Sequence, residues 1–148
     1  MSPNPPATAK SALCHPSDLV DAALRLAGSS LRHLSRVERF VESDEAVGPI
    51  PRPRLLGVLA TLLAVSSERL TAPMPAAARW VRVEASAEDG ELRLAVEDGA
   101  RDAPRGQDLA LLAEAVRRLG GTLEVSVGEC RGTQFLVRLA PARLTVLA

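Results

Sequence analysis

The chain has 148 residues, and its 18 Lys and Arg side chains balance 18 Asp and Glu, so the formal net charge is zero. This length fits one domain, which can bury roughly 70% of its unfolded surface without a disulfide or a metal ion. The neutral balance argues against a nucleic-acid or anionic-membrane surface, and 2% aromatic residues argue against base stacking. We therefore expect a globular domain with a core of Leu, Val and Ala.

The two cysteines and the apolar segments indicate where such a chain works. Cys14 and Cys130 have neither metal-binding nor redox spacing, as is typical of bystander thiols in a cytosolic protein. The longest apolar stretch, residues 55–65, is roughly half the length of a membrane span. No basic segment followed by an apolar one opens the chain, so we expect no secretory signal and a cytoplasmic location.

The first third of the chain predicts a leader, a helix and a strand. Residues 1–16 carry four prolines among small and polar residues, so we expect a flexible leader before a domain over 17–148. Ser17 and Asp18 suit the start of a helix, and apolar residues at helical spacing continue it to about residue 34. Residues 36–43 alternate and predict a strand, and the prolines among residues 48–53 predict a rigid extended connection.

The remaining two thirds predict two helices and four strands. A helix is expected over about 53–70, where leucines form a broad apolar face. After a loop over 71–78, strands near 81–85 and 92–97 are joined by a turn at 88–91. A helix ending at Gly120 should follow a polar segment, and strands near 122–127 and 134–139 end the domain. The expected inward residues of that helix are Leu109, Leu112, Ala113, Val116 and Leu119.

This order of elements predicts the fold class. Paired strands between single helices indicate an α+β fold, a two-layer α/β sandwich in which one sheet carries all the helices on one face. Polar residues that alternate outward along each strand support a one-sided sheet.

Several segments resemble a known family. Residues 91–98, 106–125 and 132–139 resemble the catalytic and ATP-binding domain of sensor histidine kinases. That domain belongs to the GHKL ATPase superfamily, shared with gyrase, the ninety-kilodalton heat-shock chaperone and MutL. Residues 18–27 and 52–63 resemble its upstream helices, so the resemblance covers about 17–140 in order. It implies the Bergerat fold, with a mixed, mostly antiparallel sheet, and a role in two-component signalling with ATP as the ligand.

The resemblance implies an adenine site at the end of a strand. Asp98 matches the aspartate that accepts a hydrogen bond from the adenine amino group, a role that suits an ionised carboxylate. Thr133 matches the threonine that supports this aspartate through a water. Ala100 and Asp102 replace the two glycines that follow it in the family. A plainer interpretation is that Asp98 begins a turn and that Thr133 bonds to a neighbouring strand.

The phosphate end of the site departs from the family pattern. Its two asparagines fall on Thr61 and Val65, and Val65 offers no oxygen to magnesium. Glu68 could replace that ligand only if the helix rotated. Gly106 matches the first glycine of the box that wraps the phosphates, but the second is Asp108, whose charge would repel them.

The lid that closes over ATP in the family is almost missing. Only residues 103–105 separate the two glycine boxes, although Arg101 or Arg105 could partly neutralise a phosphate. ATP or ADP therefore stays a candidate ligand through its adenine, whereas bound magnesium is doubtful. The sequence predicts no metal ligands and no catalytic residue.

Neither histidine has the setting of a phosphoacceptor. The family's phosphorylated histidine lies on a two-helix dimerisation hairpin and precedes an acid and an Arg-x-Pro motif. His15 lies in the leader. His33 is expected to lie at the C-terminal end of a helix, where a histidine side chain interacts favourably with the helix dipole. A Ser/His/Asp triad would need a nucleophile elbow, and the sequence contains none.

These observations lead to one hypothesis and two open alternatives. The hypothesis is a degenerate histidine kinase domain, a pseudokinase, that regulates by binding a kinase, response regulator or sigma factor with weak or no ATP turnover. One alternative is a divergent active ATP-dependent kinase or ATPase, including an anti-sigma-factor-type serine kinase. The other is a structural interaction domain with a filled pocket. No nucleic acid or membrane partner is expected, and the sequence does not indicate an oligomeric state.

Overall fold

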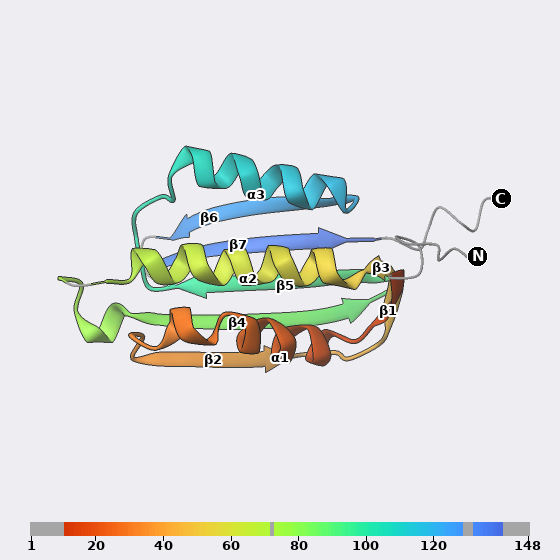
Figure 1. Ribbon diagram of the computed structural model, residues 1–148, viewed down its shortest axis with the longest axis horizontal. Helices are drawn as coiled ribbons and strands as arrows, with labels where there is room; N and C mark the ends of the chain where they lie inside the picture. Colours follow the sequence, from red (N-terminus) through yellow and green to blue (C-terminus); the bar gives the residue numbers. More distant parts are fainter. Residues whose placement is uncertain (1–10, 72, 129–131, 141–148) are drawn as a thin grey trace, which may run out of the picture.

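A sheet and a layer of helices form the protein in the computed structural model, which describes residues 11–71, 73–128 and 132–140 (Figure 1). The strands are β1 (Ser11–Cys14), β2 (Arg36–Val41), β3 (Val47–Pro51), β4 (Trp80–Glu88), β5 (Glu91–Asp98), β6 (Gly121–Gly128) and β7 (Gly132–Leu139). The helices are α1 (Pro16–Leu26), α2 (Arg52–Arg69) and α3 (Gly106–Arg118), with short 3-10 helices η2 (Gly28–Leu31) and η3 (Ala76–Ala78).

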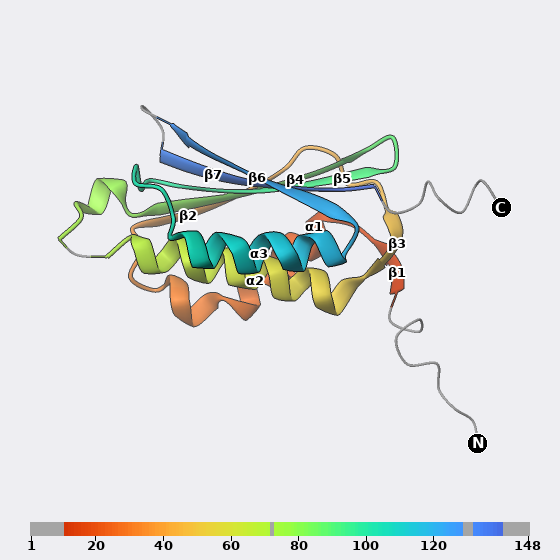
Figure 2. The same ribbon diagram turned by 90° about the horizontal axis from the view of Figure 1, so that it is seen from above.

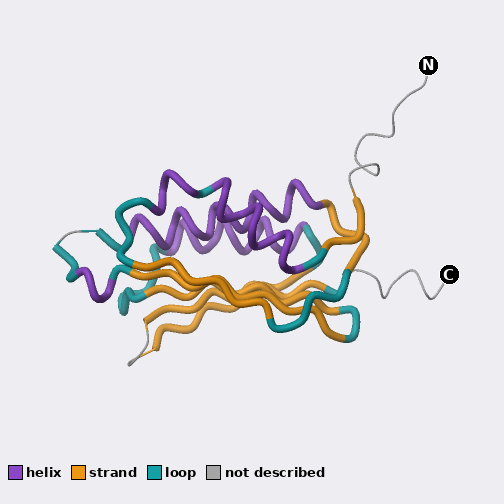
Figure 3. The backbone as a smooth tube through the Cα atoms, turned by 90° about the horizontal axis from the view of Figure 1, so that it is seen from below, coloured by secondary structure: helices purple, strands orange, loops and turns teal. Residues whose placement is uncertain are grey.

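The main sheet has five strands in the order β2-β4-β5-β7-β6. β2 runs parallel to β4, and the other neighbouring strands are antiparallel. Figures 2 and 3 show α1, α2 and α3 together on one face of this sheet. The predicted α+β sandwich, with a mixed and mostly antiparallel sheet and helices on one face, is confirmed.

The core lies between the helices and the inner face of the sheet. Inward residues alternate along β4 and β7 as the periodicity predicts, whereas β2, at the edge of the sheet, is exposed from Arg36 to Phe40. A row of buried leucines on α2 covers the inner face of the sheet. The largest of these buried side chains include Leu55, Leu59, Leu62, Leu63, Leu94 and Phe135. Within the described residues, no helix combines the length and the apolar character needed to cross a bilayer.

A second, two-stranded sheet corrects the prediction for the leader. β1 pairs antiparallel with β3, so residues 11–14 are ordered in a strand although a flexible leader was expected to reach residue 16. Cys14 is buried there, and burial raises the pKa of its thiol, which fits an inert cysteine. The pairing joins segments more than thirty residues apart in the sequence, which local composition does not reveal. Cys130 and residues 1–10 lie outside the described residues.

Two details of the helices also differ from the prediction. The helix expected over 17–34 ends at Leu26, and η2 follows, because Gly28 and the serines after it are poor helix formers. On α3, Leu112 and Val116 are buried and Leu109 and Leu119 half-buried, but Ala113 is exposed and Ala115 lies inward instead. The inward stripe is therefore shifted, since burial follows where α3 lies on β6 and α2.

A distant carboxylate caps α1. The Asp44 carboxylate accepts hydrogen bonds from the Ser17 backbone nitrogen at 2.7 Å and from the Ser17 hydroxyl at 2.8 Å. The same two bonds, the backbone one foremost, lower the pKa of Asp44. His15 Nδ1 donates to the Asp44 carbonyl oxygen at 3.0 Å. The connection between β2 and β3 thus satisfies donors that the first turn of a helix cannot satisfy itself.

We expect Asp44→Ala to lower the urea midpoint of unfolding at neutral pH, because α1 loses its cap. A carboxyl whose pKa falls on folding stabilises above its unfolded pKa of about 3.9 and ceases to stabilise as the pH falls through the folded value. The difference from the wild type should therefore vanish in acid. Urea titrations at neutral and acid pH measure it, with exposed Glu45→Ala as the control; a difference that persists in acid would contradict the cap.

Candidate functional site

The candidate site is built where β5 ends beside β7. Asp98 is the last residue of β5 and lies opposite Thr133 of β7 and Val81 of β4. Its side chain is 0% exposed. Gly132, at the start of β7, has a positive φ of 112°. A Cβ at this position would collide with the Asp98 carbonyl oxygen, so only glycine fits without strain. The sheet therefore holds a carboxylate in its interior at the strand end that the sequence predicts.

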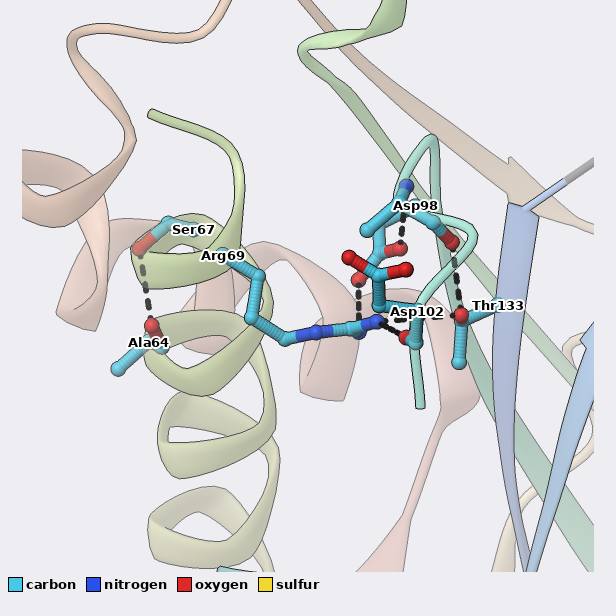
Figure 4. Close-up of polar contacts among 7 residues, drawn as sticks. Ala64, Ser67, Arg69, Asp98, Asp102 and Thr133 are labelled. Atoms are coloured by element: carbon cyan, nitrogen blue, oxygen red, sulfur yellow. Dashed lines mark hydrogen bonds and ion pairs between the residues drawn. The ribbon is translucent and has the colours of Figure 1, made fainter. Parts of the chain in front are cut away.

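An arginine that the sequence analysis missed reaches this carboxylate. Arg69, in the last turn of α2, donates from Nη1 to Asp98 Oδ2 at 3.0 Å (Figure 4). Its Nη2 donates to the Asp102 backbone carbonyl and, at 3.3 Å, to Thr133 Oγ1. The Arg69 side chain is only 15% exposed. The ion pair is therefore largely desolvated, unlike the surface pairs elsewhere on the molecule.

The other polar atoms of the site are also engaged. The Ala100 backbone nitrogen donates to Asp98 Oδ1 at 3.0 Å, and the Thr133 hydroxyl donates to the Ala100 carbonyl at 2.8 Å. Asp98 thus begins a turn, as the plainer interpretation of the sequence predicts, whereas the Thr133 hydroxyl bonds to the segment that follows β5 and not to a neighbouring strand. With Arg69 on the second oxygen, both oxygens of the Asp98 carboxylate have partners within the chain.

Burial and charge act on Asp98 in opposite directions. Desolvation raises the pKa of the carboxyl, and the Arg69 guanidinium opposes that rise. Ser66, fully buried on α2, also favours the ionised carboxylate by its proximity, although its Oγ makes no well-formed hydrogen bond. Burial is the larger effect, so the pKa of Asp98 lies above its usual value, and Arg69 is the main group that favours the ionised form.

A cavity of about 300 Å³ lies in front of this network, at the lower end of the size of ligand pockets. Arg69 lines it and Asp98 does not, so the guanidinium separates the carboxylate from the cavity. Three carboxylates line the same cavity, from Glu68, Asp102 and Asp108, against the guanidinium groups of Arg69 and Arg105. Because Arg69 is already neutralised by Asp98, the charges that face the cavity are acidic on balance.

The residues expected at the phosphate end are spread over two hollows. Thr61 is exposed, lines a separate groove between α2 and α3, and donates its hydroxyl to the Gly57 carbonyl at 2.8 Å. Val65 lines both hollows, and Glu68 lines the cavity without any rotation of α2. Gly106 is the first residue of α3 and lines neither. Asp98, Ala100 and Thr133 are thus brought together, whereas Thr61 and Gly106 stand apart from them.

These residues do not fit magnesium or a triphosphate. Val65 has no oxygen, the hydroxyl of Thr61 is bonded within its own helix, and the cavity is acidic on balance. Among residues 11–71, 73–128 and 132–140, no three His, Cys, Asp or Glu side chains gather closely enough to hold a metal ion.

His33 does not end a helix as expected and instead makes a hydrogen bond to the end of α2. It follows η2, and its Nε2 donates to the Ser67 backbone carbonyl at 2.9 Å, near the end of α2. The bond satisfies a carbonyl of the last helical turn and ties two segments together.

Comparison with known proteins places the architecture. The sequence matches no protein-family model and no curated protein. Among solved structures, the Acinetobacter baumannii histidine kinase AdeS is similar with a TM-score of 0.71 and 16% identity, over 89% of this chain and 68% of that one. The ATP-binding domain of PrrB from Mycobacterium tuberculosis gives a TM-score of 0.65 and 18% identity, over 89% and 98%. The chain has the fold of a histidine kinase catalytic domain.

This chain matches only part of the longer histidine kinases but nearly all of an isolated ATP-binding domain. The chain covers 43% of the blue-light activated histidine kinase of Erythrobacter litoralis, with a TM-score of 0.69 and 18% identity over 88% of this chain. In contrast, it covers almost the whole PrrB domain. The likeness to all three structures is one of fold, and in the longer kinase it is confined to part of the chain.

In this histidine kinase fold, Arg69 is the residue that sequence reasoning missed. The sequence offered one signal: a charged residue at the end of a helix whose preceding positions are mainly apolar or small. An arginine in the last turn of a helix has an ordinary explanation, because it favours the dipole. Only the position of the end of β5 beside that turn shows that the Arg69 guanidinium pairs with Asp98, 29 residues later in the chain.

We expect Arg69→Met to raise the pKa of Asp98 further, since the variant removes the charge that opposes burial. A carboxyl whose pKa rises on folding holds its proton more tightly when folded, so stability falls as the pH rises above about 3.9. Arg69→Met should therefore lose about 3 kcal/mol of unfolding free energy at neutral pH, and less near pH 4. Urea titrations at both pH values, with exposed Arg105→Met as the control, measure this; an equal loss at both would contradict it.

We expect Gly132→Ala to destabilise the protein by about 2 kcal/mol or more, because φ of 112° disfavours a side chain and the new Cβ would displace the Asp98 backbone. Gly28→Ala is the matched control, since a Cβ at Gly28 meets nothing within 4 Å. Thermal unfolding of both variants measures the effect. Equal melting temperatures would show that the close approach of β7 to Asp98 is not a constraint.

Proposed function

We propose that this chain is a regulator in two-component-type signalling, with a histidine kinase fold that acts by binding another protein and turns over little or no ATP. In this proposal it is a pseudokinase that works in the cytoplasm. Its partner is a signalling protein, such as a kinase, a response regulator or a sigma factor.

One observation carries the proposal: the guanidinium of Arg69 lies on the carboxylate that would recognise adenine. Asp98 has one oxygen bonded to Arg69 and the other to the Ala100 amide, and it is fully buried. An adenine amino group would have to displace Arg69, which also bonds to Asp102 and Thr133. Because such a displacement leaves a desolvated guanidinium without its partner, nucleotide binding is disfavoured.

The surroundings support the same proposal. Three acidic residues, Glu68, Asp102 and Asp108, line the cavity that phosphates would enter. Each would repel the negative charge of a triphosphate at close range. The short segment between β5 and α3 contributes Asp102 and Arg105 to the cavity wall and is itself held by Arg69. Of the two arginines in this wall, Arg69 pairs with Asp98 and Arg105 with Asp108 at 3.4 Å, so little uncompensated positive charge is left for a phosphate.

Calorimetry with ADP and ATP, with and without magnesium, tests the proposal. We expect dissociation constants weaker than about 1 mM for the wild type, and no transfer of radiolabel from γ-labelled ATP to protein. Arg69→Ala should bind ADP at least about tenfold more tightly than the wild type, because it uncovers Asp98. Adding Asp98→Asn to that variant should abolish the gain.

Arg105→Ala is the matched control, since it removes an arginine from the same cavity wall without uncovering Asp98. We expect no gain in ADP affinity from it. Thermal melting of each variant before titration verifies that it is folded. Micromolar, magnesium-dependent ATP binding by the wild type, or phosphoryl transfer, would overturn the proposal in favour of an active kinase.

A further inference from the structure

A groove of about 610 Å³ runs between α2 and α3 on the helical face of the molecule. The two helices run antiparallel (Figure 1), and apolar side chains line the groove from both: Val58 and Val65 from α2, and Leu112 and Ala115 from α3. Its lining runs from Asp108 to Leu119 along α3, a helix whose 13 residues span about 20 Å. The groove therefore follows much of the length of α3 and is apolar over its middle part.

The rims of this groove are exposed to solvent, and at Gly57 there is space for another side chain to lie against the helix. Leu111 on the α3 rim is 73% exposed, the largest value for a large apolar side chain in the described part of the chain. On the α2 rim stand Gly57 and Thr61, and a Cβ added at Gly57 would meet nothing within 4 Å. An exposed leucine continuous with an apolar groove marks a binding surface more strongly than an isolated one does.

Charge is distributed unevenly along the groove. Arg54 and Arg118 line the end at the start of α2, and Asp108 lines the other end. Arg118 pairs with Glu114 at 3.1 Å and Asp108 with Arg105 at 3.4 Å, whereas Arg54 has no ion-pair partner among the described residues. An occupant with a negative charge at the Arg54 end is therefore complementary to the groove.

The spacing of the lining residues fits a helix. On α2 the rim residues Gly57, Thr61 and Val65 recur every four positions, and on α3 Leu111 and Ala115 do the same. Rows at this spacing form the ridges and grooves into which a further helix packs. An amphipathic helix that lays an apolar row into such a channel is an established mode of peptide recognition.

We propose that the α2/α3 groove binds an amphipathic helix of the partner protein, with its apolar row between Val58 and Leu111 and an acidic residue beside Arg54 and Arg118. This inference rests on the proposed function and names the surface through which the partner is bound. The groove shares Val65 and Asp108 with the cavity in front of Arg69, so the bound helix would end beside the closed nucleotide site.

A synthetic peptide tests the proposal without knowledge of the partner. The probe is a fluorescein-labelled amphipathic helix of about 16 residues, which is about 24 Å long, with leucines at i, i+4, i+7 and i+11 and glutamates at one end. Anisotropy with the full chain should give a dissociation constant on the order of 100 µM or tighter. Amide shifts in the NMR spectrum should concentrate in residues 54–65 and 108–119. A scrambled peptide, and one with lysines in place of the glutamates, should bind at least about tenfold more weakly.

Two variants close the groove in different ways. Gly57→Leu fills it, and because leucine favours a helix over glycine by about 1 kcal/mol, the variant should be at least as stable as the wild type. Leu111→Glu places a charge on the rim, and Leu26→Glu is its matched control, since Leu26 is 62% exposed on α1 outside the groove. Both groove variants should weaken peptide binding at least about tenfold and the control should not.

Three outcomes would overturn the inference: no peptide binding, equal loss in Leu26→Glu, or concentration-dependent dimers that Leu111→Glu dissolves, which would make a second copy the occupant. None of these depends on nucleotide. Failure of the groove therefore leaves the calorimetric result intact, and ATP turnover by the wild type would overturn the proposed function without affecting the peptide measurement.

Discussion

The buried ion pair between Arg69 and Asp98 is the constraint on which the rest of the site depends. A carboxylate at 0% exposure is costly unless its charge is matched, and here one guanidinium provides the match. The same guanidinium bonds to the Asp102 carbonyl and to Thr133, so it joins the end of α2, the segment after β5 and the start of β7. Removing it would leave three elements without their common partner.

Both oxygens of the Asp98 carboxylate are engaged by partners within the chain. In the implied adenine site, the carboxylate at the end of β5 needs a partner supplied from outside, whereas here α2 supplies the partner from within the fold. The acidic cavity left in front of Arg69 is poorly suited to phosphate. The helical layer also carries an apolar groove with Arg54 and Arg118 at one end, where we propose that a partner helix binds.

Sequence periodicity predicted the inner strands β4 and β7 well because burial alternates regularly along them. Val81 to Ala87 on β4 and Phe135 to Leu139 on β7 have inward residues at every second position, as expected. The failures share a cause, since each was decided by a distant segment. Residues 11–14 form a strand only because β3 pairs with them, and Ala113 is exposed because α2 and β6 determine how α3 rests on the sheet.

Residue type, periodicity and order along the chain were enough to predict the sandwich and the place of Asp98 at a strand end with Thr133 beside it. They also show that Val65 has no side-chain oxygen. The contact between Arg69 and Asp98 could not be predicted in this way, because the two are 29 residues apart and a guanidinium on a long side chain can lie in solvent equally well. The packing of α2 across β5 brings that charge to the carboxylate, and desolvation then makes the pairing necessary.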